Sequence, residues 1–213
     1  MTTPDQFRLR PFQPGDEDAL YEVCLKTGDS GSDASQLYKD PMALGQLYVG
    51  PYVALEPELA FVLEDVLEGH SGVCGYVLGA LDTEKFQRVF KERWLPPLQA
   101  TLPDPSGDPA KWNHDERIYH ELHHPRLEFS PPLAPYPSHL HIDLLARAQG
   151  RGWGRRMIET LLDALRARGS RGVHLGVGLA NTRAQGFYRK LDFQELFRVN
   201  ADGSGAIFMG RFL

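Results

Sequence analysis

The stretch Gln149-Gly-Arg-Gly-Trp-Gly154 lies between a segment with the pattern of a β-strand and a segment with the pattern of an amphipathic helix. Before it, polar and apolar residues alternate from His139 to Leu145, which is typical of a strand. After it, apolar residues recur at helical spacing, and Gly169 marks the end of the predicted helix. The recurring positions are Gly154, Met157, Ile158, Leu161, Leu162 and Leu165. The sequence therefore predicts a strand, a glycine-rich loop and a helix in succession.

The glycine-rich loop has the properties of a diphosphate site. The first amides of a helix lack partners within the helix and lie at the positive end of its dipole, so they attract anions. Gly150, Gly152 and Gly154 would let a bulky phosphate approach the backbone, while Arg155 and Arg156 add positive charge. The alternative is a glycine-rich turn before an ordinary basic helix. Two other phosphate motifs are excluded, because the loop has neither the Gly-Lys-Ser/Thr of a P-loop nor the G-x-G-x-x-G of a dinucleotide fingerprint.

Length and composition favour one domain. The chain has 213 residues, enough for a substantial core, so we expect a single domain over residues 1–213. The net charge is −5 and the arginines form no long basic stripe, so nucleic acid is not an expected partner. Because no apolar run approaches the length of a membrane span and Met1–Arg10 lacks the core of a signal peptide, we expect a cytoplasmic protein that does not bind membranes. Cys24 and Cys74 are expected to be reduced and buried.

Hydrophobic patterns predict alternating strands and helices in the rest of the chain. Strands are expected at Phe7–Phe12, Ala60–Glu64, Val73–Leu81, Val173–Val177, Phe193–Val199 and Ala206–Leu213, and helices at Asp16–Thr27, Thr83–Ala100 and Thr182–Leu191. The strands at 60–64 and 73–81 are expected to pair through a turn at residues 68–72.

The composition changes between Thr101 and Pro137, where proline, histidine and charged residues dominate and only His114–His124 has a helical pattern. Long loops of this kind within a domain are usually functional. Trp94, Trp112 and Tyr119 indicate that this part of the chain packs against the rest. We therefore expect an insertion at about residues 83–137, before the central strand.

A second motif follows the glycine loop. Asn181, Ala184, Tyr188 and Phe193 fit the spacing N-x-x-A-x-x-x-Y-x-x-x-x-F. Together with the Q-x-x-G-x-G loop, this spacing resembles the GNAT superfamily of N-acetyltransferases. The resemblance follows the element order from Phe7 to Leu213 and is sharpest from His139 to Phe193. The family usually has glycine before this phenylalanine, and Asp192 in its place affects only the local turn.

Several shorter runs resemble the acetyltransferase-like domain at the C-terminus of animal O-GlcNAcases. They are Tyr21–Thr27, Phe61–Asp65, Gly72–Asp82 and Gly169–Val173. In that domain the acetyl-CoA loop is degraded, whereas here it is intact. The resemblance therefore implies a free-standing, bacterial-type relative that still binds the cofactor.

The GNAT resemblance implies an α/β fold whose mixed, mostly antiparallel central sheet splays open around acetyl-CoA and is flanked by helices. Leu144, Leu145 and Ala146 would pair with the pantetheine arm as another strand would, beside a bulge that opens the sheet. One of their amides would polarise the thioester carbonyl. The pyrophosphate would lie on the loop and first turn formed by Gln149, Gly150, Arg151, Gly152, Trp153, Gly154 and Arg155.

Two residues of the second motif have two interpretations each. In the family, the position of Tyr188 implies a general acid that protonates the departing CoA thiolate. Alternatively Tyr188 is a core residue, because it shares a helical face with Ala184 and Leu191. Asn181 either contacts the cofactor or caps the helix that follows it.

An amine acceptor must lose a proton before it attacks. Neutralising an ammonium of pKa ~10.4 at pH 7 costs about 4.6 kcal/mol, so a base or a chain of waters is needed. His139, His141 and Asp143 lie on one face of the predicted central strand, where unpaired polar groups would be costly to bury. We predict Asp143 as the first candidate for the base or amine anchor and His141 as the second. The alternative is a structural hydrogen-bond network among them.

The stretch His120-Glu-Leu-His-His124 matches the H-E-x-x-H helix of zinc proteases, with Glu121 as the base. Pro125 would end the helix at once, and no third ligand stands at the expected spacing. A solvated helix in a histidine-rich insertion explains these residues as well. We therefore expect no metal site, and a zinc-dependent hydrolase using His120, Glu121 and His124 is a remote alternative.

The sequence thus predicts an acetyl-CoA-dependent N-acetyltransferase that moves the acetyl group directly to a primary amine in a ternary complex. The alternative from another class is a module that binds acetyl-CoA with little or no transferase activity. The acceptor would be a small molecule or a peptide, selected by Gly28–Leu55 and Thr83–Pro137, which contain no motif that identifies it. The sequence is compatible with a homodimer.

Overall fold

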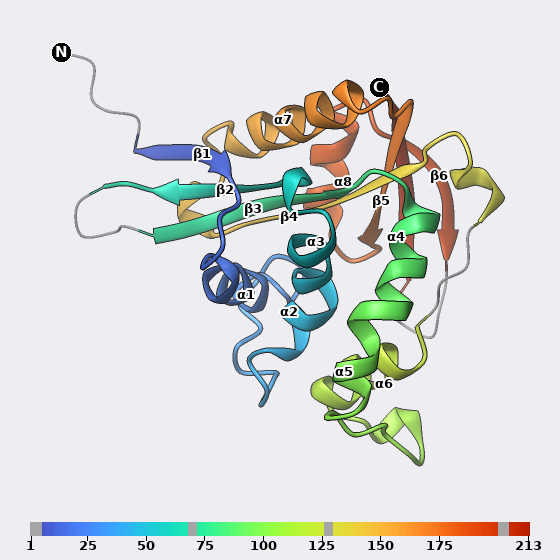
Figure 1. Cartoon of the computed structure of the whole chain (residues 1–213). Coiled ribbons are helices and arrows are strands. Elements are labelled where there is room, and N and C mark those ends of the chain that lie inside the picture. Colours follow the sequence, from blue (N-terminus) through green and yellow to red (C-terminus); the bar gives the residue numbers. More distant parts are fainter. Residues whose placement is uncertain (1–5, 68–71, 126–129, 200–204) are drawn as a thin grey trace.

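A seven-stranded sheet in the order β1-β2-β3-β4-β5-β7-β6 forms the centre of the computed structural model, which describes residues 6–67, 72–125, 130–199 and 205–213 (Figure 1). Neighbouring strands are antiparallel except β4 and β5, which are parallel. This confirms the mixed, mostly antiparallel sheet. The strands are β1 (Phe7–Pro11), β2 (Ala60–Asp65), β3 (Gly72–Ala80), β4 (Ser138–Leu144), β5 (Gly172–Gly178), β6 (Gln194–Val199) and β7 (Ala206–Phe212).

Helices cover both faces of the sheet, and Figure 1 shows α7 on one face of β1–β4 and helices α1 to α6 on the other. The helices are α1 (Glu17–Leu25), α2 (Ala43–Tyr48), α3 (Gly50–Leu55), α4 (Thr83–Val89), α5 (Leu95–Gln99), α6 (His114–His123), α7 (Trp153–Ala167) and α8 (Thr182–Arg189). A π-helical turn at Phe90–Trp94 joins α4 to α5, which confirms the helix predicted at 83–100 but with a wider turn before its two prolines.

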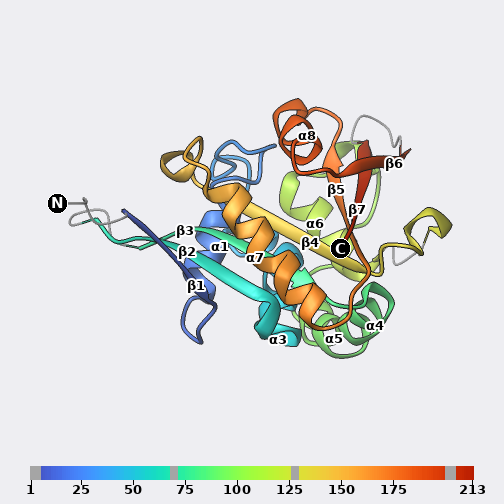
Figure 2. The same cartoon turned by 90° about the horizontal axis from the view of Figure 1, so that it is seen from above.

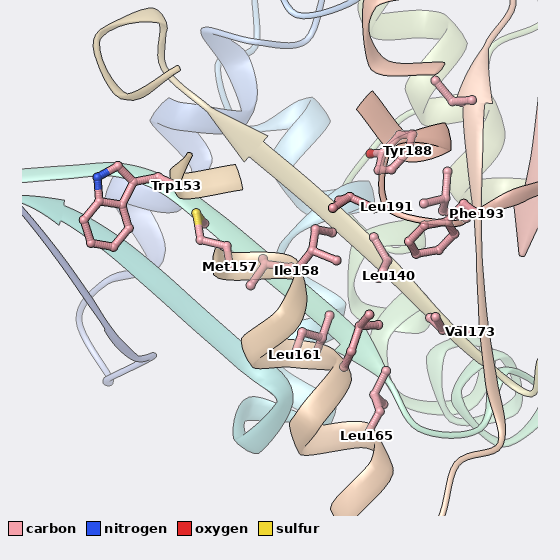
Figure 3. Packing of buried hydrophobic residues seen from close by; sticks show 14 of the residues in the cluster. Leu140, Trp153, Met157, Ile158, Leu161, Leu165, Val173, Tyr188, Leu191 and Phe193 are labelled. Atoms are coloured by element: carbon pink, nitrogen blue, oxygen red, sulfur yellow. The ribbon is translucent and has the colours of Figure 1, made fainter. Parts of the chain in front are cut away.

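Helix α7 forms the larger core because one of its faces is entirely apolar. Met157, Ile158 and Leu161 are fully buried, and they pack with Leu140 of β4 and Val173 of β5 (Figure 3). The alternation in β4 thus directs Leu140 toward α7. Burial of each such side chain contributes roughly 1.5–3 kcal/mol relative to exposure. This core ties together strands on both sides of the β4–β5 junction.

The opposite face of the sheet packs against α1 to α6 through a second core. Tyr76 and Leu78 of β3 contribute to it, together with Leu20 of α1 and Leu122 of α6, and all four side chains are fully buried. Leu122 thus places the inserted helix α6 against the same layer as α1, which confirms that the insertion packs against the rest of the chain.

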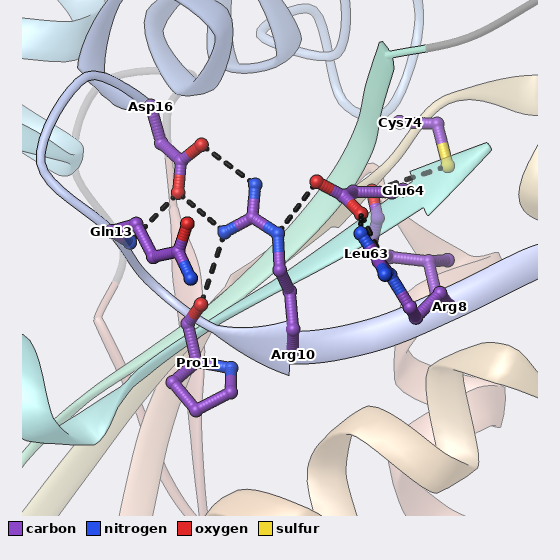
Figure 4. A network of polar contacts seen from close by, with 8 residues as sticks. All are labelled: Arg8, Arg10, Pro11, Gln13, Asp16, Leu63, Glu64 and Cys74. Carbon is purple, nitrogen blue, oxygen red and sulfur yellow. Dashed lines mark hydrogen bonds and ion pairs between the residues drawn. The ribbon is translucent and has the colours of Figure 1, made fainter. Parts of the chain in front are cut away.

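Ion pairs join the edge of the sheet to the start of α1 (Figure 4). The guanidinium of Arg10 donates to Glu64 on β2 at 2.6 Å and to both carboxylate oxygens of Asp16 at 2.7 Å. The hydrogen bonds from Arg10 lower the pKa of the Asp16 carboxyl. These contacts orient α1 against the first two strands.

Helices α2 and α3 are not anticipated by the patterns above, because they are short and have no clear periodicity. Most of the turn expected at residues 68–72 lies outside the described residues. Cys24 and Cys74 are free and buried, as expected. In the described part of the chain, no helix has the length and apolar character needed to cross a membrane.

The contact between β3 and α7 can be tested at Gly79. A Cβ at Gly79 would lie 2.7 Å from Cδ1 of Leu161, so Gly79→Ala is expected to destabilise the fold by about 1–3 kcal/mol through overpacking. Leu161→Ala leaves a cavity and is expected to cost about 2–5 kcal/mol. In the double variant the new methyl group occupies vacated space, so the loss is smaller than the sum of the single losses. Urea denaturation measures all four proteins, and additive losses would contradict this contact.

Candidate active site

The parallel strands β4 and β5 pair only at their beginning. Ser138 pairs with Val173 and His139 with His174, after which the two strands run apart (Figure 2). On its other edge, β4 pairs with β3 without interruption up to Leu144. The bulge expected near Leu144 is therefore wrong for this pairing, and the sheet opens because β5 diverges.

The divergence leaves one edge of β4 without a strand neighbour in the part of the chain that is described. The amide of Leu145 donates to Cys74 of β3 at 2.8 Å. Because alternate residues of an antiparallel strand direct their backbone groups to opposite edges, the backbone groups of Ile142 and Leu144 face the open edge. The side-chain amide of Gln149 donates to the Leu144 carbonyl at 2.6 Å, which fixes the loop against the end of β4.

The glycine loop presents unpaired amides beside this edge. Gly150 and Gly152 have φ angles of +73° and +82°, and a Cβ at either position would meet no atom within 4 Å. Gly152 is the N-cap of α7 and offers no side chain to its first turn. Among the described residues, the amides from Gly150 to Arg155 donate to no protein acceptor. They are available to an anion, as the diphosphate interpretation requires.

Gly154 has a packing function that the sequence did not indicate. A Cβ there would lie 3.1 Å from Cζ of Phe187, so glycine at this position allows α8 to pack against α7, and its contact with a phosphate stays a prediction. Arg155 donates to the carbonyl of Lys190 at 3.0 Å, which also joins the two helices.

The side chains of Trp153 and Arg151 are engaged within the protein. The Trp153 indole is buried against the Phe7 ring, with 6.0 Å between ring centroids. The Arg151 guanidinium donates to the side-chain oxygen of Gln6 at 3.2 Å and lies over the same Phe7 ring. In this arrangement Trp153 can offer a ligand only its backbone amide.

Tyr188 is a core residue, as one of its two interpretations predicted, and its role as a general acid stays a prediction. Its ring packs against Phe187 and Phe193 in the α7 core. Its hydroxyl points from α8 toward β4 (Figure 3) and makes no hydrogen bond among the described residues. Burial raises the pKa of Tyr188, with a smaller contribution from the charge of Asp143. The phenol therefore stays protonated at neutral pH, as a general acid must.

Asp143 and His141 form a network on the other face of β4. Asp143 accepts a hydrogen bond from the Tyr76 hydroxyl at 2.5 Å and lies 3.1 Å from Nε2 of His141. The His141 ring stacks on Tyr48 with centroids 5.7 Å apart. The His141 and Asp143 side chains are 33% and 22% exposed, so the network reaches the surface. Sequence patterns missed Tyr76, which lies in the second core and meets Asp143 only because the two residues are paired across β3 and β4.

His139 does not belong to this network. Its Nδ1 lies 2.9 Å from the Thr83 hydroxyl, and its ring is flanked by Tyr52 and Phe86. Burial lowers the pKa of His139 to about 3, with smaller contributions from His174 and His141. His139 is therefore neutral and structural.

Asn181 is the N-cap of α8, because its side-chain oxygen accepts from the amide of Ala184 at 3.0 Å. The capping interpretation is therefore confirmed. A contact from Asn181 to a cofactor stays a prediction.

The H-E-x-x-H stretch lies at the C-terminal end of α6. Helix α6 ends at His123, and His124 is its C-cap, as the following proline suggested. No third ligand is expected at the spacing of a zinc protease, and folding of the insertion places Asp104, which precedes the motif, beside His120 and His124. No fixed spacing in the sequence identifies Asp104.

The chain matches known acetyltransferases in sequence and in structure. Residues 109–193 match the model of the acetyltransferase (GNAT) family. The crystal structure of SsHAT is 40% identical, covers 98% of both chains and superposes with a TM-score of 0.86. The chain belongs to the GNAT acetyltransferase family. Its α/β fold and its enzyme class are those predicted from the two motifs.

Two further relatives of this GNAT chain bear on the earlier resemblance. The chain is 30% identical to the Protein O-GlcNAcase of Rattus norvegicus over 99% of its own length, and it spans 22% of that protein. The structure of yncA from Salmonella typhimurium with its cofactor acetyl-CoA is 14% identical, with a TM-score of 0.54 and coverage of 98% of this chain and 94% of that one. At this identity yncA supports the fold alone.

The low pKa of His139 predicts a pH dependence of stability. Below pH 6.5 the unfolded chain binds a proton at His139, whereas the folded chain does so only near pH 3. The free energy of unfolding should therefore fall as the pH falls through this window, by up to about 1.4 kcal/mol per pH unit from this residue. His139→Gln removes this contribution. Urea unfolding at several pH values should show a shallower slope for the variant, and equal slopes would contradict the assignment.

Proposed function

We propose that this GNAT chain is an N-acetyltransferase that uses acetyl-CoA and transfers the acetyl group directly to a primary amine in a ternary complex. The observation that supports this most strongly is the end of β4–β5 pairing after His139, with the unpaired amides of the glycine loop beside the opened edge. The proposal includes the expectation of a cytoplasmic protein acting as one domain.

The open edge and the loop suit two parts of acetyl-CoA. The amides of Gly150–Arg155 and the positive end of the α7 dipole would hold the pyrophosphate. The pantetheine arm, which has amide groups of its own, would lie along Leu144, Leu145 and Ala146 in place of a strand. The Leu144 amide faces the opening and is our candidate for the donor to the thioester carbonyl, where negative charge grows during attack.

The two candidate proton-transfer groups, Asp143 and Tyr188, lie on opposite faces of β4. The amine nitrogen attacks the thioester carbonyl, the carbon–sulfur bond breaks, and the amide bond forms. Asp143, alone or together with His141, would take the proton that the amine loses, directly or through water. Tyr188 would give its proton to the departing thiolate. The Tyr188 hydroxyl lies on the α8 side of β4 and the Asp143 carboxylate on the α1 side. Different residues would therefore accept the proton of the amine and donate a proton to the CoA thiolate.

The residues around Asp143, where we place the acetyl acceptor, favour a cationic amine. The His141 ring lies beside the Asp143 carboxylate and stacks on Tyr48, whose side of the layer is partly exposed. Aromatic faces and a carboxylate together attract an ammonium group. A small molecule or a peptide with a primary amine would meet these requirements.

A module that binds acetyl-CoA without efficient transfer is the second candidate. It is favoured by the contacts that Asp143 already has within the protein, since its carboxylate accepts from the Tyr76 hydroxyl and lies 3.1 Å from Nε2 of His141 instead of being free for an acceptor. Calorimetric titration with acetyl-CoA followed by an acceptor screen distinguishes the two. Release of free thiol that depends on the amine supports the enzyme. Binding without release over small amines, aminoglycosides, peptide N-termini and lysine peptides would support the module.

Gly152→Asp tests the phosphate site. The substitution adds a negative charge beside the diphosphate and a side chain at φ +82°, so we expect acetyl-CoA affinity to fall by at least about 100-fold. Gly107→Asp is the matched control, since Gly107 has φ +89° and open space around its Cβ position, yet lies in the insertion. Calorimetry on both folded variants measures the effect. Unchanged affinity in Gly152→Asp would show that the diphosphate lies elsewhere.

Tyr188→Phe tests the general acid. The ring keeps its packing against Phe187 and Phe193, so binding of acetyl-CoA should be unchanged. Loss of the proton donor is expected to lower kcat by about 100-fold. Initial rates of thiol release, measured with an acceptor found in the screen, give the value. A variant with normal kcat would leave Tyr188 with a packing role alone.

A further inference from the structure

Asp104, His120 and His124 come together where the segment 101–113 meets the C-terminal end of α6. Candidate ligand atoms of the three side chains all lie within 4.8 Å of one another. Nε2 of His124 is 2.9 Å from Oδ2 of Asp104, and Nδ1 of His120 is 3.9 Å from its Oδ1. One carboxylate therefore faces two imidazole rings, whose centroids are 4.5 Å apart.

The Nδ1 atom of His120 provides a second, independent observation. This atom is buried and has no hydrogen-bond partner among the described residues, although the His120 side chain as a whole is 40% exposed. The Trp112 ring packs on the imidazole at a centroid distance of 4.6 Å. A buried polar atom without a partner is costly and uncommon in a native structure, and a bound ion is one of its ordinary explanations.

We propose that Asp104, His120 and His124 bind a divalent transition-metal ion of the Zn²⁺ type. Two imidazole nitrogens and one carboxylate oxygen are a ligand set that suits Zn²⁺, Co²⁺ and Ni²⁺ and is too rich in nitrogen for Mg²⁺ or Ca²⁺. The ion would bind Nδ1 of His120, Nε2 of His124 and one oxygen of Asp104, replacing the present His124–Asp104 contact. Water would complete the coordination.

The site is structural rather than hydrolytic. In zinc proteases two histidines and the catalytic glutamate lie on one continuous helix. Here α6 ends at His123, so that His124 is only its C-cap, and the third candidate ligand, Asp104, comes from the segment before the helix. The metal would instead fasten segment 101–113 to α6.

The same helix holds the chain that precedes α2. The Asp115 carboxylate accepts from the backbone amides of Lys39 and Asp40, and the Tyr119 hydroxyl donates to the Asp40 carboxylate at 2.8 Å. The α2 residue Tyr48 stacks on His141. An ion at the end of α6 would thus stabilise the layer that borders the proposed acceptor side.

Metal counting tests the proposal directly. The chain, freed of any affinity tag, is treated with chelator, dialysed against Zn²⁺ and analysed for bound metal, and Zn²⁺ affinity is then measured by calorimetry. We expect about one ion per chain in the parent and at least about tenfold weaker binding in His120→Ala and Asp104→Asn. His114→Gln, which removes a histidine from the other end of α6, is the matched control and should bind as the parent does.

Limited proteolysis supplies a readout independent of affinity. Zn²⁺ should slow cleavage within 101–113 in the parent and in His114→Gln, but not in His120→Ala or Asp104→Asn. Circular dichroism and calorimetric titration with acetyl-CoA show whether each variant is folded. Absence of bound Zn²⁺ in the folded parent, or unchanged binding in both ligand variants, would overturn the proposal. Neither result bears on acetyl transfer, because the two sites share no residue.

Discussion

The need to satisfy backbone hydrogen-bonding groups is the constraint on which the candidate site depends. β4 has a complete ladder to β3 on one edge, but β5 pairs with it only as far as His139. In the part of the chain that the structure describes, the amides of the glycine loop have no acceptor either. These two sets of unpaired groups lie in succession along the chain, at the end of β4 and the start of α7. A ligand with amide groups and a diphosphate would satisfy both.

The strand β4 connects this edge to the two cores. Leu140 packs with α7, while His141 and Asp143 face the layer of α1 to α6. Substitutions in either core therefore affect the strand that presents the site. Tyr188 and Asp143 come from different layers, because Tyr188 packs in the α7 core while Asp143 faces Tyr76 of the second core.

The glycines show how one residue type meets different physical needs. Gly150 and Gly152 have left-handed φ angles and open space around them, whereas Gly154 and Gly79 are glycine because Phe187 and Leu161 pack against their backbones. The glycine motif as a sequence pattern does not separate these cases. The difference arises from the packing of α8 and α7, which the local glycine pattern does not specify.

The sequence by itself determined the order of the elements, the glycine loop, the end of α6 before Pro125, a candidate cap of α8 at Asn181, and the alternation of β4, because each depends on residues a few positions apart. Only the tertiary structure decided that Tyr76 meets Asp143, 67 residues away, and that Asp104 meets His124, 20 residues away. It also decided that β5 diverges and that His139, half-buried, lies between Tyr52 and Phe86. Contacts of this kind follow from strand register and from the packing of an insertion, and local patterns do not specify either.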